Sequence, residues 1–291
     1  MIHLVDAHNH LGDWSPDASQ SYETLMARAR ERGILGVGIS DHYDPDCEMA
    51  DGSAWTFDPK AYMDTFYPRR RMPSGRKEGD PPGFLLGIEL GWMPETGTVL
   101  HEVVRDHPFD FSIVSIHYFK NLDPFTHADE IYTSSLHKVY TGVIQAIADS
   151  AEDMAEANIV GHFDFFSRYA PERDSKMHYS HAPEAFDRLF RIMVKNGQAL
   201  EINVGTVNSL MKRKGYSLKE AMPDAAILNR FRELGGRSFT ICSDAHHEDQ
   251  NGLHMKETMD YLKILGIDSF VWFEAGEEKK IEKRGPAFRD E

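Results

Sequence analysis

Short apolar stretches recur along the chain, and each has the length of one β-strand. They are rich in Ile, Val, Leu and Phe, as are strands that are buried on both faces of a sheet. Seven such stretches are residues 2–7, 35–40, 84–89, 111–116, 159–162, 199–204 and 239–243. Residues 270–273 form an eighth candidate strand.

Segments with the apolar spacing of helices lie between these stretches. In the longest segment, residues 134–157, Val139, Val143 and Ile147 fall on one side of a helix. Glycines closely follow several of the segments, as is typical of helix C-termini. The expected helices are residues 22–32, 62–70, 98–107, 134–157, 183–196, 224–234 and 253–265. Strands and helices that alternate in this way predict parallel strands with right-handed crossovers, in an open sheet or a closed barrel.

The residues at the predicted strand ends decide between these two architectures. They carry side chains that ligate metals or transfer protons: His8 and His10, Asp41 and His42, Glu89, His117, His162 and Asp164, Glu201 and Asn203, and Asp244 and His246. An open sheet would spread these groups along a line, whereas a barrel gathers all strand C-termini around one mouth. We therefore expect an α/β barrel that spans residues 1–291 as one domain, with a frayed, charged tail from about residue 276.

Composition and charge narrow the possible partners. The chain of 291 residues is 41% hydrophobic and 27% charged, as is usual for a globular protein. Its formal net charge of -15 disfavours binding to nucleic acid or to an anionic membrane, although bound cations could neutralise part of it. A small anionic substrate remains possible.

The cysteines and the N-terminus bear on the expected location. Cys47 and Cys242 are the only two cysteines, which excludes a disulfide framework and a cysteine-rich zinc module. The first residues contain neither a basic segment nor a long apolar run, so we expect no signal peptide and no membrane span. A reducing cytoplasm fits these observations best.

The segment Asp6-Ala7-His8-Asn9-His10 contains the first candidate metal ligands. Because side chains alternate along a strand, Asp6, His8 and His10 should face the same way. A His-x-His pair does not by itself identify a metal site, because two solvated or hydrogen-bonded histidines would explain it. The carboxylates and imidazoles at the other strand ends favour a metal site, because such groups are seldom buried unless they are paired or ligating.

Mixed imidazole and carboxylate ligation suits zinc, iron or manganese and argues against calcium. The candidate ligands exceed the needs of one ion, so two or three divalent ions could share Glu89 or Asp244 as a bridge. Such clusters activate water and hold the oxygens of a phosphoryl group during its displacement. The residues thus indicate a metal-dependent hydrolase.

An ordered set of short motifs also carries a family resemblance. The motifs are DAHNH, SDHYDP, GIELGW, SIHYF, GHFDFFSRY, EIN and CSDAH. In order and spacing they resemble the polymerase-and-histidinol-phosphatase (PHP) superfamily, and most closely its histidinol-phosphate phosphatases. The resemblance extends from about residue 8 to residue 273 and implies a distorted seven-stranded (β/α) barrel, similar to a TIM barrel, with a three-metal centre.

The resemblance also implies the ligands of each ion. His8 and His10 would bind one ion together with Glu89 and Asp244. Glu89 would bridge to a second ion, and a third ion would have ligands of its own. The remaining implied ligands are His117 and His162 for the second ion, His42 and His246 for the third, and Asp17 as the nearest match to a further family ligand.

The implied reaction is hydrolysis of a small phosphate monoester, most specifically L-histidinol phosphate in histidine biosynthesis. Arg168 matches a basic residue that faces the substrate phosphate in the family, and its planar fork of donors suits that task. The family's basic residue after EIN is missing. Lys212, Arg213 or Lys214 could reach the phosphate from a longer loop, or the phosphate pocket could differ from that of the family. A metal-bound water, Asp244 or His247 could protonate the leaving group.

Two other functions remain open from the sequence. The chain could be a PHP phosphoesterase with another substrate, such as a nucleotide or a sugar phosphate. It could also be a non-catalytic module that holds metals for a partner protein, although the complete ligand set argues against this.

Overall fold

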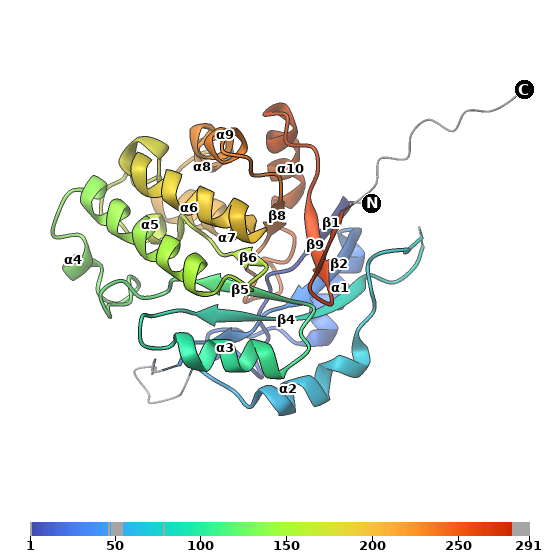
Figure 1. The fold of residues 1–291 in the computed structure, drawn as a ribbon. Helices are drawn as coiled ribbons and strands as arrows, with labels where there is room; N and C mark the ends of the chain where they lie inside the picture. Colours follow the sequence, from blue (N-terminus) through green and yellow to red (C-terminus); the bar gives the residue numbers. More distant parts are fainter. Residues whose placement is uncertain (1, 46, 48–54, 78, 281–291) are drawn as a thin grey trace, which may run out of the picture.

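Seven parallel strands form a nearly closed barrel in the computed structural model, which describes residues 2–45, 47, 55–77 and 79–280. Their order around the barrel is β1-β2-β4-β5-β6-β7-β8, so neighbours in space are also neighbours along the chain (Figure 1). The strands are β1 (Ile2–Asp6), β2 (Ile34–Ile39), β4 (Gly83–Gly91), β5 (Phe111–Ser115), β6 (Ile159–Val160), β7 (Ala199–Asn203) and β8 (Phe239–Cys242). The predicted distorted seven-stranded barrel is confirmed.

The barrel closes between β1 and β8 through side chains as well as backbone. The backbone N–H and the hydroxyl of Ser243 both donate to the carboxylate of Asp6, at 2.8 and 2.6 Å. Asn9 and Ala245 form an isolated parallel bridge just beyond the strands. Asp6 therefore joins the first and last strands, although it shares a strand face with His8 in the sequence pattern.

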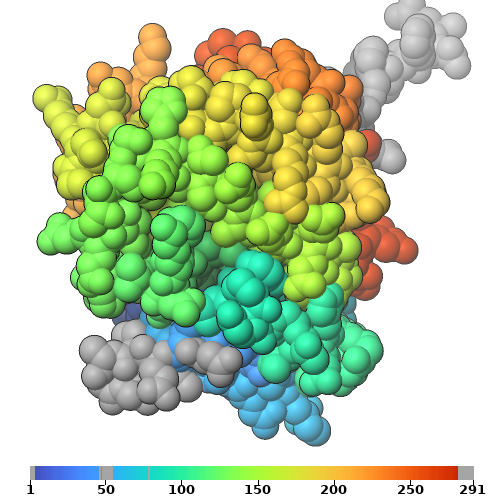
Figure 2. All heavy atoms as spheres, turned by 60° about the vertical axis from the view of Figure 1, so that its left-hand side comes forward, coloured from blue at the N-terminus to red at the C-terminus, as the bar shows by residue number. Residues whose placement is uncertain are grey.

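Helices cover the outside of the barrel, as expected from the alternating pattern. Figure 2 shows the green and yellow part of this layer as a continuous surface above the teal part of the chain. The longer helices are α1 (Tyr22–Glu31), α2 (Pro59–Phe66), α3 (Gly97–Asp106), α5 (Leu136–Asp153), α6 (Pro183–Asn196), α7 (Val204–Lys214), α9 (Ala225–Glu233) and α10 (Met255–Ile264). Shorter elements are α4 (Ala128–Ile131), α8 (Leu218–Ala221), η1 (Tyr67–Arg69), η2 (Phe165–Arg168) and η3 (Tyr179–His181).

Local signals explain where these helices begin and end. Ser21 caps α1, where its side chain accepts the backbone N–H of Thr24. Gly197 ends α6 with a φ of 74°, a left-handed conformation that glycine adopts without a steric penalty.

The segment after β7 differs from the sequence prediction. The basic residues after EIN were expected to lie on a longer loop, but residues 204–214 form helix α7. Asn203 caps this helix by accepting the N–H of Thr206, and Gly215 ends it with a φ of 71°. The segment was missed because Gly205 and the β-branched residues around it are poor helix formers. A short strand, β3 (His42–Tyr43), was also missed and pairs with β4.

A hairpin closes the N-terminal end of the barrel. β9 (Val271–Glu274) is the eighth predicted strand, but it pairs antiparallel with β10 (Glu277–Lys280) instead of joining the barrel. Trp272 and Phe273 pack against Val5 and other barrel residues. The prediction that the chain frays from residue 276 is wrong for residues 277–280, and the rest of that tail lies outside the described residues.

Next to this hairpin, the ring of Phe111 fills the interior of the barrel. A Cβ on Gly87 would lie 2.3 Å from this ring, and a Cβ on Gly38 would lie 2.7 Å from it. Two glycines on adjacent strands therefore provide the space for one large side chain. The packed core leaves the C-terminal mouth as the open end for polar groups.

Within the described ranges, no helix is long and apolar enough to cross a bilayer.

Candidate metal centre

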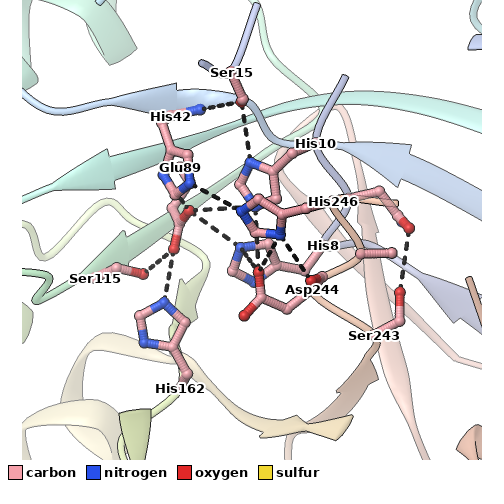
Figure 3. Close-up of polar contacts among 12 residues, drawn as sticks. His8, His10, Ser15, His42, Glu89, Ser115, His162, Ser243, Asp244 and His246 are labelled. Atoms are coloured by element: carbon pink, nitrogen blue, oxygen red, sulfur yellow. Dashed lines mark hydrogen bonds and ion pairs between the residues drawn. The ribbon is translucent and has the colours of Figure 1, made fainter. Parts of the chain in front are cut away.

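The C-terminal ends of the barrel strands bring the predicted ligands together at one mouth (Figure 3). Most of these side chains are buried, whereas Asp17 is 37% exposed at the rim. The structure places all nine predicted ligands in this cluster: His8, His10, Asp17, His42, Glu89, His117, His162, Asp244 and His246. Their side chains form three groups around Glu89 and Asp244.

The first group lies at the ends of β1, β4 and β8. His8 Nε2 lies 3.2 Å from Glu89 Oε2 and 3.7 Å from Asp244 Oδ1. His10 Nε2 lies 3.6 Å from the same glutamate oxygen and 3.4 Å from the same aspartate oxygen. Two imidazole nitrogens and two carboxylate oxygens thus face one point.

The second group uses the other oxygen of Glu89. Its Oε1 lies 3.1 Å from His117 Nε2 and 2.9 Å from His162 Nε2, and the two nitrogens are 3.3 Å apart. Ser115 donates to the same oxygen at 2.6 Å. Glu89 therefore extends one carboxylate oxygen to each of two adjacent groups, as a bridging ligand would.

The third group lies closer to solvent. His42 Nε2 and His246 Nε2 are 3.3 Å apart, and the carboxylate of Asp17 lies 3.7 Å from the first and 3.2 Å from the second. The loop that carries Asp17 is tied to the end of β8, because the N–H of Ser19 donates to the carbonyl of His246. The structure thus brings Asp17 to the other candidate ligands.

The donor atoms of all three groups fit divalent metal ions. Ligands at about 2.0–2.1 Å from a tetrahedral ion lie about 3.3 Å from one another. Several of the buried donors have no hydrogen-bond partner within the described part of the chain: His8 Nε2, His10 Nε2, His42 Nδ1, Asp44 Oδ2 and Glu89 Oε2. Buried polar atoms without partners are costly, and a shared cation would satisfy these together.

The imidazoles are held by hydrogen bonds on the side away from the cluster. His8 Nδ1 lies 2.7 Å from Glu201, His117 Nδ1 lies 2.6 Å from Asp44, and His10 Nδ1 lies 3.2 Å from Ser15. Each of these partners can accept an Nδ1 proton, which leaves Nε2 as the lone-pair nitrogen that faces the cluster.

Asp44 was not among the predicted site residues, and Glu201 was noted at a strand end but was assigned neither as a ligand nor as a catalytic residue. Asp44 is two positions after His42, so strand alternation was the signal that could have found it. Asp41 is also at a strand end, but it accepts hydrogen bonds from Leu11, Ser15 and Tyr62 and therefore holds loops together.

The electrostatic field of the cluster favours ionised carboxylates. Burial by itself would raise the pKa of Glu89, but His8, His117 and His42 outweigh it and hold this pKa well below its usual range. Burial also opposes the charge on His246, yet the nearby Asp17 raises the pKa of this imidazole to about 9. A cation at the third group would displace that proton, so its affinity should fall with falling pH.

The backbone at Asp244 adopts an uncommon conformation. Its φ is 53°, in the left-handed region, which costs a residue other than glycine of the order of 1 kcal/mol. This conformation directs the side chain into the cluster and the carbonyl oxygen to His246 Nδ1 at 3.0 Å. Strain of this kind is often retained where a functional geometry depends on it.

The predicted phosphate ligand Arg168 lies beside the first group. Its Nη2 donates to Asp244 Oδ2 at 2.9 Å and to Asn203 Oδ1 at 2.8 Å, while Nε donates to Thr206 at 2.9 Å. The side chain is only 11% exposed and stacks over Phe165. Arg168 is therefore a fixed cation at the edge of the metal cluster.

The other predicted substrate residues are placed differently. Lys212 and Arg213 lie in the last turn of α7, where the expected long loop would have been. The guanidinium of Arg213 lies over the rings of Tyr169 and Phe125, at 5.0 and 5.9 Å from their centroids. His247 is exposed, and its Nδ1 bonds to Ser19 at 2.7 Å instead of pointing at the carboxylates.

Aromatic rings form a wall that leads outward from the second group. The Phe165 ring lies 4.9 Å from that of His162 and 5.3 Å from that of Tyr169. Tyr169 in turn lies 6.0 Å from Phe125, which is 64% exposed. We call these three residues, Phe165, Tyr169 and Phe125, the aromatic wall.

A barrel whose strand ends hold clustered imidazoles and carboxylates defines a metal-centre protein of the (β/α) class. The PHP domain family matches residues 6–205, which is more than half of the chain, and the chain belongs to this family. The matched region begins at the last residue of β1, contains the barrel strands from β2 to β7 and ends before β8.

Relatives with known names and structures share most of this chain. A protein of Clostridium acetobutylicum described as "Probable histidinol-phosphatase" is 27% identical over 93% of this chain and 97% of its own length. A histidinol-phosphatase of Lactococcus lactis is 22% identical over 70% of this chain and 72% of its own length.

The same fold occurs in a crystal structure of histidinol phosphate phosphatase from Lactococcus lactis complexed with zinc, L-histidinol and phosphate. Its TM-score is 0.79 at 19% identity, and the match covers 95% of this chain and 98% of that chain. At this level of identity the likeness shows the shared fold.

Proposed function

We propose that this protein is a metal-dependent phosphate monoesterase that hydrolyses L-histidinol phosphate to L-histidinol and phosphate. The observation that carries the proposal is the arrangement of three ligand groups around Glu89 with the cation Arg168 beside Asp244. The relatives named histidinol-phosphatase and the shared fold support this reaction for the PHP barrel.

The site would hold two or three divalent ions, and zinc is supported by the relative that binds it. When bound, these ions would activate water for attack on phosphorus and neutralise charge on the phosphoryl oxygens. Iron and manganese remain compatible with the mixed ligands. The proposed ligands are the nine clustered side chains, with Glu89 as the bridge.

Arg168 would bind the phosphoryl group from the side of the first group. Its bonds to Asn203, Thr206 and Asp244 occupy Nε and Nη2, which leaves Nη1 for a phosphoryl oxygen. Because the side chain is already fixed, little reorganisation accompanies the development of charge in the transition state.

Burial would raise the pKa of Asp244, but His8, His10 and Arg168 hold it well below its usual range, so Asp244 would act as a ligand and not as the acid for the leaving group. His247 bonds to Ser19 and would have to turn towards the cluster to protonate the leaving group.

The aromatic wall supports a planar alcohol half for the substrate. An imidazole ring could stack on Phe165 or Tyr169, whereas a sugar hydroxyl pattern would need more hydrogen-bond partners there. Arg213 would contribute to substrate binding at the outer end of the aromatic wall, where its guanidinium contacts Tyr169 and Phe125. Lys212 stays a weaker candidate, because it lies exposed at the end of α7.

A panel of phosphate monoesters tests the substrate. The zinc-loaded protein should hydrolyse L-histidinol phosphate with a higher kcat/KM than nucleotide or sugar phosphates. A preference for those other substrates would refute the histidinol assignment but retain the phosphatase. No turnover of any ester by the metal-loaded protein would instead favour a metal-holding module for a partner.

Substitution of the bridge tests the metal centre. Glu89→Gln should lose ions from both the first and the second group and lower kcat by at least about 1,000-fold, because metal-assisted attack is lost. Full metal content and full activity in this variant would refute the proposed centre.

The proposed cytoplasmic location stays a prediction, tested by fractionation of cells that express the full chain.

A further inference from the structure

Glu201 is a buried carboxylate that contacts two different metal-ligand groups. It lies on β7, and its side chain has no exposed surface. Its Oε1 lies 2.7 Å from His8 Nδ1, and its Oε2 accepts the backbone N–H of His162 at 2.5 Å. His8 follows β1 and His162 follows β6, so one carboxylate joins segments that are distant in the sequence.

The two contacts lead to different ligand groups. His8 Nε2 faces Glu89 Oε2 in the first group, and His162 Nε2 faces Glu89 Oε1 in the second. Glu89 faces the Nε2 atoms of both histidines, on the side where the ions would lie. Glu201 contacts the same two residues on the opposite side, at His8 Nδ1 and at the backbone N–H of His162. We infer that Glu201 is a positioning residue that couples metal binding at the first and second groups.

The contact with His8 determines which ring nitrogen can ligate. A neutral imidazole carries its proton on one nitrogen and its lone pair on the other. When Nδ1–H donates to Oε1 of Glu201, Nε2 keeps the lone pair that faces the first group. A carboxylate behind a ligating histidine also increases the basicity of that ligand.

The contact with His162 determines where the second ligand lies. The ladder between β6 and β7 ends with Val160 paired to Leu200, two residues before His162. Beyond the ladder, Oε2 of Glu201 accepts the backbone N–H of His162. The position of the His162 ring therefore depends on the same side chain that orients His8.

A second side chain completes this support. Asn203 Nδ2 lies 3.3 Å from Glu201 Oε2 and 3.3 Å from Asp244 Oδ2. Glu201 and Asn203 are two positions apart on β7 and therefore point into the barrel together. The coupling thus extends from His162 in the second group, through Glu201 and Asn203, to Asp244 in the first group.

The test is Glu201→Gln in the full chain, with Zn²⁺ as the probe and without substrate. Glutamine has one acceptor oxygen and one amide donor, so it can satisfy only one of the two N–H groups. Zn²⁺ competition against a chromophoric chelator should show affinities about 10- to 100-fold weaker for two ions together. The ion at His42 and His246 should bind as in the wild type.

Glu274→Gln is the matched control. Glu274 is also a buried carboxylate that uses both oxygens, but its partners Ser74 and Trp272 lie at the opposite end of the barrel. This variant should lower the thermal midpoint and leave Zn²⁺ affinity unchanged. If both variants weaken Zn²⁺ binding equally, or if Glu201→Gln binds two ions as tightly as the wild type, the inference is overturned.

A replacement variant and a comparison with phosphatase activity complete the experiment. If Glu201→Gln does not fold, Glu201→Asp takes its place, because the shorter carboxylate cannot reach both partners and should also weaken two ions. The inference rests on the metal centre of the proposed function, but its readout needs no phosphate ester. Coupled loss of Zn²⁺ in a protein without phosphatase activity would support the role of Glu201 and refute the proposed reaction.

Discussion

The carboxylate of Asp244 is shared between Arg168 and the metal cluster. Its Oδ2 accepts a hydrogen bond from Arg168 Nη2 at 2.9 Å, while its Oδ1 lies 3.4 Å from His10 Nε2. The guanidinium and the proposed ions are thus held in a fixed relation by one side chain. In the proposed reaction, this relation would position a phosphoryl group between the guanidinium and the metal ions.

Substitution of Arg168 should therefore reduce turnover more than metal binding. We expect Arg168→Lys to lower kcat/KM by about 10- to 100-fold, because lysine keeps the charge but loses the planar fork of donors. Arg168→Ala should lose more, since both the charge and the stacking on Phe165 disappear. Steady-state kinetics and metal analysis of the same samples check this, and an unchanged kcat/KM in both variants would exclude a role for Arg168 in binding phosphate.

Gly91 provides the space that Asp44 occupies behind His117. A Cβ at residue 91 would lie 1.8 Å from Asp44 Oδ1, so Gly91→Ala must displace this carboxylate from His117 Nδ1. We expect about 1–3 kcal/mol lower stability and weaker metal binding at the second group. Denaturant unfolding and Zn²⁺ titration measure the two effects.

Gly97→Ala is the control for this steric effect. A Cβ there would lie 2.5 Å from Asp153 Oδ2, but this carboxylate is 43% exposed and can rotate away. The control should keep wild-type Zn²⁺ affinity. If Gly91→Ala also keeps it, Asp44 has no part in positioning His117.

Phe125 should contribute to the choice of substrate. Loss of one stacking ring costs about 0.5–1.5 kcal/mol, so Phe125→Ala should raise KM for a substrate with an aromatic alcohol half by about 2- to 12-fold. KM for glycerol phosphate should not change. Ile264→Ala, at a residue that is 83% exposed, serves as the control. Equal changes in KM for both substrates would contradict the role of the aromatic wall.

The ion pair between Asp187 and Arg230 should make stability depend on pH. Hydrogen bonds from Arg230 lower the pKa of Asp187 to about 2, from 3.8 in its ordinary state. Because the folded pKa is lower, the pair stabilises the fold above about pH 4, and this contribution is lost as the pH falls towards 2. Arg230 is 31% exposed, so solvent screens the pair and its contribution should be small.

Urea unfolding of Asp187→Asn measures this contribution. The variant should be less stable than the wild type at pH 7, and the difference should shrink between pH 4 and pH 3. A difference that is constant over this range would show that the pair contributes through packing instead of charge.

Much of the barrel could be predicted because its signals are local. Strand-length apolar runs and helical spacing depend on neighbouring residues, so the seven barrel strands and most of the longer helices were found from the sequence. Helix α7 was not found, because Gly205 and its β-branched neighbours are poor helix formers. Asn203 nevertheless caps its start, and Gly215 ends it. The position of β9 outside the barrel was also missed, because no local sequence signal distinguishes a strand that covers the end of a barrel from a strand of the barrel itself.

The sequence by itself determined which side chains could ligate metals, because alternation along a strand and the position at its C-terminal end are local properties. Only the tertiary structure decided how these side chains divide their roles. Asp6 joins β1 to β8 beside His8, and Glu201 contacts His8 across 193 residues of chain. Such pairings arise from the closure of the barrel, which brings together strand ends whose separation in sequence carries no information about their contact.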